Sequence, residues 1–178
     1  MKDTVKIKTK PKVGKKARVA NTSDHIQRPF FPKPKLVNPP KVTLEQAINA
    51  AWSDDMKNAK TVSLVSVKRF KPIKVRGHLF YPIVGRTATD ENGNRHKVTA
   101  LFVNELLRRK TPIVVDCTCG RHKFFFEAAN ARRGLSFLFR SNGDRPEQTN
   151  PRMKIGICKH TIRTLAWAVR NLKTLNKV

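Results

Sequence analysis

All three cysteines of this 178-residue chain fall into one spaced pattern, which constrains the fold more than any other feature. Cys117 and Cys119 form a Cys-x-Cys pair, and Cys158 and His160 form a Cys-x-His pair. Thiolate sulfur and imidazole nitrogen are the ligands that tetrahedral Zn²⁺ prefers, and four of them leave no position for water. The sequence therefore predicts one structural zinc ion, which closes a long loop and contributes to folding.

Two other interpretations of the cysteines and one other ligand stay open. A disulfide within Cys-x-Cys would be strained, and no secretory signal indicates an oxidising compartment. Metal-free buried thiols would have no reason to fall into two spaced pairs. His122 is also near enough to Cys119 to be the fourth ligand. We favour His160, because its spacing repeats that of the first pair and a C-terminal helix should begin there.

The four residues resemble the SWIM zinc finger, in which Cys-x-Cys, a variable insert and Cys-x-His precede a helix. The matching helix here is the run 161–172, and the resemblance covers residues 110–175, about a third of the chain. It implies a β-β-α finger that binds DNA or other proteins. The insert between the pairs, residues 120–157, has 38 residues and is long for that family.

A second resemblance is to SWIM-like proteins of large tailed phages. In those proteins an Arg-His-aromatic run follows the first pair, and an Asn-Pro…Gly-x-Cys-Lys-His run closes the site. The corresponding residues of this chain are 121–126 and, at the second pair, Asn150-Pro151 followed by 156–160. This resemblance implies a protein of the virion.

The charge of the chain is strongly positive, with 38 Lys+Arg against 12 Asp+Glu and a net charge of +26. Such a chain binds polyanions, and nucleic acid is the usual partner. We expect contacts through phosphates, with DNA favoured over RNA although no residue separates the two. The chain has no apolar run of transmembrane length and no lipidation motif, so we expect no membrane partner and no small-molecule substrate.

Residues 1–41 are predicted to form a basic, proline-rich, extended arm. The first 40 residues hold 11 Lys+Arg against 2 Asp+Glu, together with six of the eleven prolines. Little apolar surface is available to offset the ordering entropy, and the prolines favour extended backbone. Phe30 and Phe31 are predicted to anchor the arm in neighbouring subunits, and a solubilising tail is the alternative. The cations of the arm predicted to contact nucleic acid are Lys6, Lys8, Lys10, Lys12, Lys15, Lys16 and Arg18.

The remainder is predicted to be one α+β domain, with a helix and β-hairpin region at 42–110 packed against the zinc-binding region at 111–178. Thr43 and Gln46 form a capping box that opens a helix to about residue 60. Residues 61–67 and 77–84 have β-strand composition, and Asn92-Gly93 predicts a hairpin turn between the flanking segments.

Further along the chain, a short helix is predicted at 103–109 and a strand at 112–117. A helix at 124–133 should end at Gly134, and residues 141–157 should form a loop. The C-terminal run 161–175 is predicted to be a helix with one core-facing stripe. That stripe consists of Ile162, Leu165, Ala166, Val169 and Leu172.

Three consecutive phenylalanines, residues 124–126, follow the first cysteine pair among basic residues. Such a run could stack on bases, but we expect it to pack against the C-terminal helix. Four cations of the zinc-binding region are better candidates for phosphate contacts. They are Arg121, Lys123, Arg132 and Arg133.

We expect no enzymatic activity. The acidic residues are dispersed, and the zinc deaminase, phosphate-loop and nucleophile-elbow motifs are missing from the sequence. A zinc ion with four protein ligands has no position at which to activate water.

The sequence thus predicts a zinc-stabilised structural protein of a nucleoprotein assembly. The leading prediction is a head- or neck-associated component of a tailed-phage virion, assembled in the host cytoplasm, that contacts DNA and neighbouring subunits. The alternatives are a ribosomal or ribosome-associated RNA-binding protein of a cytoplasmic ribonucleoprotein, and a SWIM-type DNA-binding accessory factor.

Overall fold

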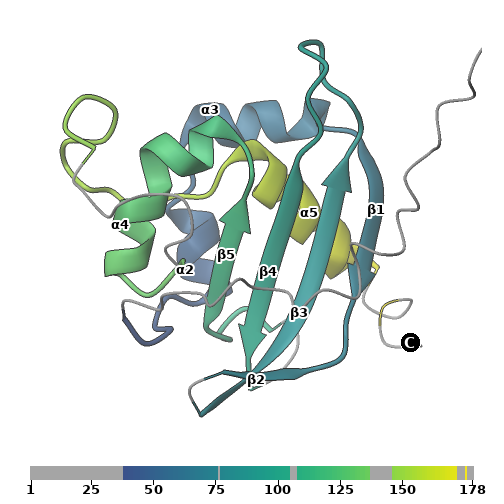
Figure 1. Cartoon of the computed structure of the whole chain (residues 1–178), viewed down its shortest axis with the longest axis vertical. Helices are drawn as coiled ribbons and strands as arrows, with labels where there is room; N and C mark the ends of the chain where they lie inside the picture. The colour runs from purple at the N-terminus through teal and green to yellow at the C-terminus, as the bar shows by residue number, and fades with distance from the viewer. Residues whose placement is uncertain (1–37, 76, 105–107, 137–145, 172–174, 176–178) are drawn as a thin grey trace, which may run out of the picture. The chain divides into compact units, whose positions relative to one another are not determined.

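A computed structural model describes residues 38–75, 77–104, 108–136, 146–171 and 175 of the chain. These residues form a mixed α+β domain, in which helices α2 to α5 lie on one side of an antiparallel sheet (Figure 1). The predicted α+β class is therefore confirmed. Phe30, Phe31 and the seven cations predicted to bind nucleic acid from the arm lie outside the described residues.

The sheet has five strands, and every pairing in it is antiparallel. Its order is β1-β3-β4-β5, and β2 pairs with β3 beside β1. The strands are β1 (Leu64–Arg69), β2 (Ile73–Val75), β3 (His78–Thr87), β4 (Lys97–Val103) and β5 (Ile113–Cys117).

The hairpin predicted around Asn92-Gly93 is confirmed, because it joins β3 to β4. Asp90 shapes its turn, since one carboxylate oxygen accepts the N–H groups of Asn92 at 3.0 Å and Asn94 at 2.7 Å. Gly93 has a φ of 77°, a left-handed conformation that glycine adopts without strain. All residues of β5 and all but the first of β4 are buried, so these two strands do not alternate in polarity.

The predicted helix from the capping box to residue 60 is broken into two, α2 (Leu44–Asn49) and α3 (Ser53–Asn58). The capping box itself is confirmed, with Thr43 Oγ1 accepting from the Gln46 N–H and Gln46 Oε1 accepting from the Thr43 N–H. Trp52 interrupts the helix with an extended conformation (φ −73°, ψ 146°). Its ring packs against aromatic residues near the cysteines, and this tertiary packing outweighs helix propensity.

The predicted helix at 103–109 is wrong at each of its described residues. Val103 is the last residue of β4, and its N–H donates to the Pro112 carbonyl at 3.0 Å. Asn104 follows with a left-handed φ of 61°, and Arg108 and Arg109 are not helical. Val103 pairs with Phe80 of β3, so β4 extends into the first residue of the predicted helix.

The predicted helix at 124–133 is present in two parts. A π-helical turn, η2 (His122–Phe126), leads into α4 (Glu127–Arg132). Gly134 has a φ of 74° and ends the helix as predicted. Residues 146–157 contain no helix or strand, which confirms the predicted loop where it is described.

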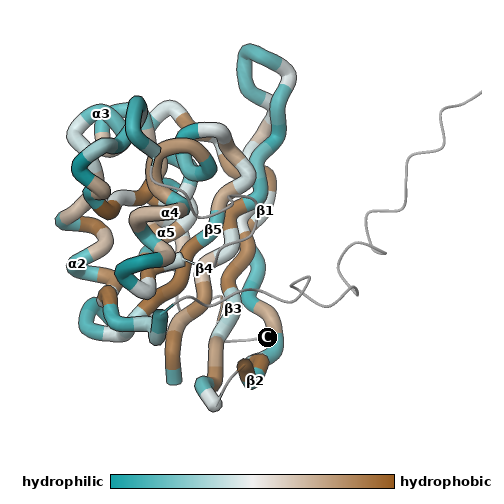
Figure 2. Tube along the Cα trace, turned by 60° about the vertical axis from the view of Figure 1, so that its left-hand side comes forward, coloured by the Kyte–Doolittle hydropathy of each residue, from teal (hydrophilic) through white to brown (hydrophobic). Residues whose placement is uncertain are grey.

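The C-terminal helix α5 (Lys159–Arg170) packs across the sheet and supplies Ile162, Leu165 and Ala168 to the main core. Val169 is 45% exposed, so the buried stripe differs from the predicted one. Figure 2 shows apolar segments along the strands of the sheet, beside the helices. The helix approaches β3 so closely that a Cβ on Gly85 would lie 2.5 Å from Thr164 Cγ2.

None of the helices in the described part of the chain has the length and apolar character needed to span a bilayer. Residues 38–41, at the end of the predicted arm, lie against the C-terminal end of α4. Asn38 donates a hydrogen bond to the Arg132 carbonyl at 2.7 Å, and Pro39 packs on Gly134.

Candidate metal centre

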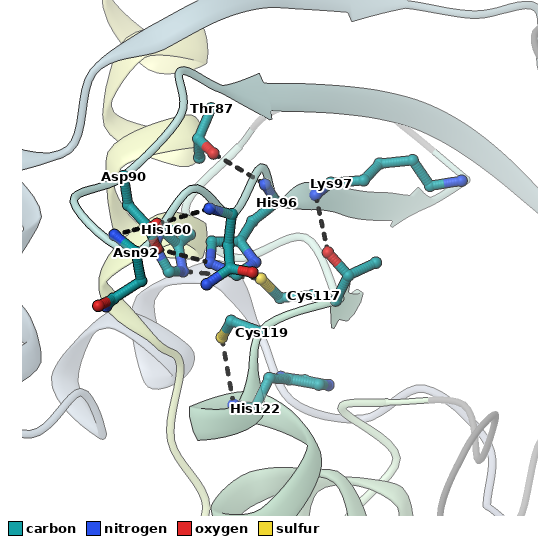
Figure 3. Close-up of polar contacts among 11 residues, drawn as sticks. Thr87, Asp90, Asn92, His96, Lys97, Cys117, Cys119, His122 and His160 are labelled. Atoms are coloured by element: carbon teal, nitrogen blue, oxygen red, sulfur yellow. Dashed lines mark hydrogen bonds and ion pairs between the residues drawn. The ribbon is translucent and has the colours of Figure 1, made fainter.

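The two spaced pairs meet in one buried cluster. Cys117 ends β5, Cys119 lies two residues further on, Cys158 is the N-cap of α5, and His160 is in its first turn. Their ligand atoms all lie within 4.8 Å of one another, and all four residues are buried. Cys117, Cys119 and His160 come together at one end of the sheet in Figure 3.

The cluster fits a single four-coordinate ion. Zn–S bonds of about 2.3 Å and Zn–N bonds of about 2.0 Å give a tetrahedron with edges of about 3.5–3.8 Å. The distance of 3.9 Å from Cys117 Sγ to His160 Nδ1 is close to such an edge. The group can therefore hold a metal ion and is compatible with one zinc. His160, and not His122, completes the set.

Apolar packing surrounds the sulfur atoms. Cys117, Cys119 and Cys158 form a small core with Val98 and Phe126. The His122 N–H donates to Cys119 Sγ at 3.3 Å, and Cys158 Sγ lies 3.3 Å from Thr161 Oγ1. These polar contacts stabilise negative charge on sulfur in a site that excludes water.

The three thiols alter one another's pKa values. Burial raises the pKa of Cys117 well above its usual value, and hydrogen bonds from the other two thiols raise it further. The pKa of Cys119 is about 12, because the hydrogen bond with Cys117 lowers it less than Cys158 and burial raise it. Burial also opposes the thiolate of Cys158, yet hydrogen bonds from Cys117, Cys119 and His160 hold its pKa well below the usual value. Cys158 is therefore the first thiolate of the cluster, at the positive end of the α5 dipole.

A buried carboxylate on α3 connects the two ligand pairs. Asp55 Oδ2 accepts hydrogen bonds from Arg121 Nε at 3.2 Å and Arg121 NH2 at 3.1 Å. Asp55 Oδ1 accepts from the backbone N–H of Lys159 at 3.3 Å. Arg121 lies two residues after Cys119, and Lys159 lies between the two ligands of the second pair. Asp55 thus positions the backbone on both sides of the metal cluster.

A second pair of polar residues lies against the histidine ligand. Figure 3 places Asp90 and His96, from the turn between β3 and β4, beside His160. The His96 and His160 rings have centroids 4.4 Å apart, and Asp90 Oδ2 lies 3.5 Å from His96 Nε2. Burial lowers the pKa of His96, and so does the nearby His160, while Asp90 opposes both. The lowered pKa favours the neutral form of the His96 ring, which packs beside the His160 ring.

His122, the alternative ligand, is enclosed elsewhere. Its side chain has no exposed surface, and neither ring nitrogen has a hydrogen-bond partner among the described residues. Its Nε2 lies 3.6 Å from Asp116 Oδ1 on β5, beyond hydrogen-bonding distance. The backbone N–H of His122 contacts the cluster by donating to Cys119 Sγ.

The four cations predicted near the zinc pairs have different surroundings. The Arg121 guanidinium pairs with Asp55 and lies over the rings of Phe125 at 4.2 Å and Trp52 at 4.9 Å. These contacts hold the guanidinium within the domain, and its contact with phosphate stays a prediction. Lys123 lies over the Phe124 ring at 5.0 Å. Arg132 and Arg133 are exposed at the end of α4.

The three consecutive phenylalanines, residues 124–126, differ in their burial. Phe126 is fully buried and Phe125 is partly buried, but their ring partner is Trp52 beside the cysteine cluster, whereas the sequence predicts packing against the C-terminal helix. Phe124 differs, since 58% of its surface is exposed.

Sequence reasoning missed Asp55, Asp90 and His96. Asp55 precedes the first ligand by more than 60 residues, and nothing in its local sequence separates it from Asp54. Asp90 and His96 could have been found from the predicted hairpin turn, which holds a carboxylate and an imidazole close together.

No family model, curated protein or solved structure matches this chain.

Proposed function

We propose that this protein is a non-enzymatic, zinc-stabilised component of a nucleoprotein assembly, and that it binds nucleic acid through phosphates. The observation that carries the proposal is a buried set of three cysteines and one histidine in a chain of net charge +26. Four protein ligands complete a tetrahedron, which favours a structural metal over a catalytic one. A high positive charge favours polyanionic partners.

The proposed finger type is SWIM. Three features support it: the Cys-x-Cys pair begins at the last residue of β5, β5 pairs antiparallel with β4, and the Cys-x-His pair opens α5. The order of hairpin and helix corresponds to a β-β-α unit. The long insert contributes η2 and α4, which lie between the two ligand pairs.

The proposed setting is the virion of a tailed phage, assembled in the host cytoplasm, with DNA as the nucleic acid and neighbouring subunits bound through the arm. Support for this setting is the resemblance of residues 121–126 and 150–160 to SWIM-like phage proteins. A ribosome-associated protein that binds RNA is the second candidate. The basic composition of residues 1–40 favours either setting equally.

The metal is tested by elemental analysis of the purified protein and by thermal unfolding of His160→Ala. We expect one zinc per chain and a clearly lowered unfolding midpoint for the variant, because it loses a metal ligand. His78→Ala, on β3 outside the cluster, is the matched control and should keep its zinc. A wild-type protein without zinc would contradict the metal assignment.

Nucleic-acid binding is tested by fluorescence anisotropy at several salt concentrations with DNA and RNA of one sequence. Binding through phosphates requires affinity to fall steeply with salt and to depend little on sequence. A flat salt dependence is incompatible with the proposal, and tighter binding to RNA would favour the ribosomal alternative.

The arm is tested by deleting residues 1–37 and measuring incorporation of the shortened protein into the assembly. We expect a zinc-loaded domain that no longer incorporates, because the arm carries the proposed subunit contacts. Normal incorporation would identify residues 1–37 as a solubilising tail.

A further inference from the structure

A basic groove lies beside the metal-binding domain's helices. It has a volume of about 1240 Å³ and runs between α2, the end of α4 and the loop 149–155. Five of the described residues that line it are cations, and none of the described lining residues is acidic. The cations are Lys41, Arg132, Arg133, Arg152 and Lys154. We call this feature the basic groove.

The cations of the basic groove are available for a ligand. All five are exposed, and none forms an ion pair with another described residue. Arginine and lysine side chains are normally paired or dispersed on a protein surface, so five unpaired cations around one concavity create a positive potential. The groove therefore attracts an extended anion.

Hydrogen bonds fix the walls of the basic groove. Asn150 Nδ2 donates to the carbonyls of Phe125 and Lys154, both at 2.8 Å, and Asn150 Oδ1 accepts from the Lys154 N–H. Thr149 Oγ1 donates to the Phe124 carbonyl at 2.6 Å. The loop is thus tied to the segment that leads into α4, and the cations are held on a prearranged frame.

We infer that the basic groove binds a single strand of nucleic acid, with its phosphates on the five cations. The groove is larger and more open than the pockets of roughly 300–1,000 Å³ that enclose small ligands, so a segment of a polymer suits it better. Single-strand binders combine a positive groove with aromatic residues on which bases stack. Phe124 does not line the groove, but it offers an exposed ring nearby, because its carbonyl accepts a hydrogen bond from the lining residue Thr149.

Two other polyanions suit the basic groove less well. A duplex is a convex rod, and proteins read it with protruding helices or strands rather than with a concavity. An acidic peptide could pair with the cations, but it has no flat base that could stack on the Phe124 ring. Lys123 Nζ lies 5.0 Å from the centroid of that ring, so a cation stands beside the stacking position. The single strand uses both the charge and the exposed ring.

This inference rests on the proposed function and is tested in the full chain with a fluorescent oligothymidylate. The groove variant is Arg132→Gln/Arg152→Gln/Lys154→Gln. Three exposed cations on the opposite, β1–β2 side of the sheet give a control with the same loss of charge, Lys68→Gln/Lys71→Gln/Lys74→Gln (Figure 1). Zinc content and the unfolding midpoint of both variants verify that they are folded.

The expected magnitude follows from counterion release. Each phosphate contact on a single strand contributes about 0.7 to the salt slope, so three contacts change the slope by about 2. At about 0.15 M salt this corresponds to roughly 50-fold weaker binding for the groove variant. The affinity of the control for the oligothymidylate should decrease only a few-fold. Phe124→Ala should weaken binding without changing the salt slope.

The outcomes separate the inference from the proposed function. If wild type binds with a steep salt slope but groove and control variants weaken equally, the groove inference fails and the proposed function stands. If wild type does not bind nucleic acid at all, the proposed function fails. Equal sensitivity of duplex binding to the groove variant, or equal competition by polyglutamate, would overturn the assignment of a single strand.

Discussion

Replacing Asp55 by asparagine tests whether a residue distant in sequence holds the metal cluster together. Asp55 has a side chain only 7% exposed, whereas its partner Arg121 is 32% exposed. In Asp55→Asn the amide oxygen can still accept the hydrogen bond from the Lys159 N–H. The amide NH₂ then faces the Arg121 guanidinium, and because both groups are donors, no hydrogen bond forms between them. The variant thus removes the charge while conserving the volume.

The size of the effect follows from the burial of the pair. Removing one partner of a fully buried ion pair costs about 3–5 kcal/mol. Because about a third of Arg121 reaches water, we discount this to about 2 kcal/mol. A domain of this size changes its unfolding midpoint by about 2–4 °C per kcal/mol, so we expect a decrease of about 4–8 °C. Zinc affinity should fall about 10- to 100-fold, as for other residues that orient metal ligands.

The measurements are differential scanning calorimetry of the zinc-loaded protein and competition for zinc against a chromophoric chelator. Asp54→Asn is the matched control, because Asp54 is exposed and precedes Asp55 in the same first turn of α3. The control has the same change in charge and in helix-dipole interaction. Equal zinc affinities for the two variants would refute the positioning role of Asp55.

Three further predictions concern packing and protons. Asn130→Ala should lower the free energy of unfolding, measured by chemical unfolding, by about 2–4 kcal/mol. The variant removes the buried amide that hydrogen-bonds to both the N–H and the C=O of Gly156. Gly156→Ala should lower the free energy of unfolding by about 1–3 kcal/mol, because the added Cβ would lie 2.5 Å from the Phe126 ring. Its control is Gly120→Ala, whose Cβ would lie 3.7 Å from the nearest side chain and should leave the unfolding midpoint nearly unchanged. Zinc affinity, measured by chelator competition, should fall about 100-fold for each unit that the pH is lowered near neutrality. The reason is that the metal must displace one proton each from Cys117 and Cys119, whose pKa values are raised. An affinity that does not change with pH would contradict this.

The ligand set could be predicted from the sequence because its chemistry is local. Two thiols one residue apart can reach one ion whatever surrounds them, and the position of His160 at a helix start fixes its direction. Turn and cap signals at Asn92-Gly93, Thr43 and Gly134 succeeded for the same reason. Each depends on backbone geometry within a few residues.

The parts that could not be predicted depend on contacts between distant segments. Trp52 breaks a helix because its ring packs against Phe125 and Phe126, more than 70 residues away. The sequence predicts a helix that begins at Val103, because the pairing of this residue with Phe80 of β3 is not visible in the local sequence. The partner of Arg121 is likewise set by the placement of α3 and not by any neighbouring residue.

The position of the basic groove along the chain has a thermodynamic consequence. Arg132, Arg133, Arg152 and Lys154 all lie between Cys119 and Cys158, inside the 38-residue segment whose ends the metal joins. A strand bound to these cations and an ion bound to the cluster would both stabilise the same segment. By linkage, each then strengthens the binding of the other by an equal factor. If the protein binds nucleic acid as proposed, removing zinc would therefore also weaken that binding, without altering a single phosphate contact.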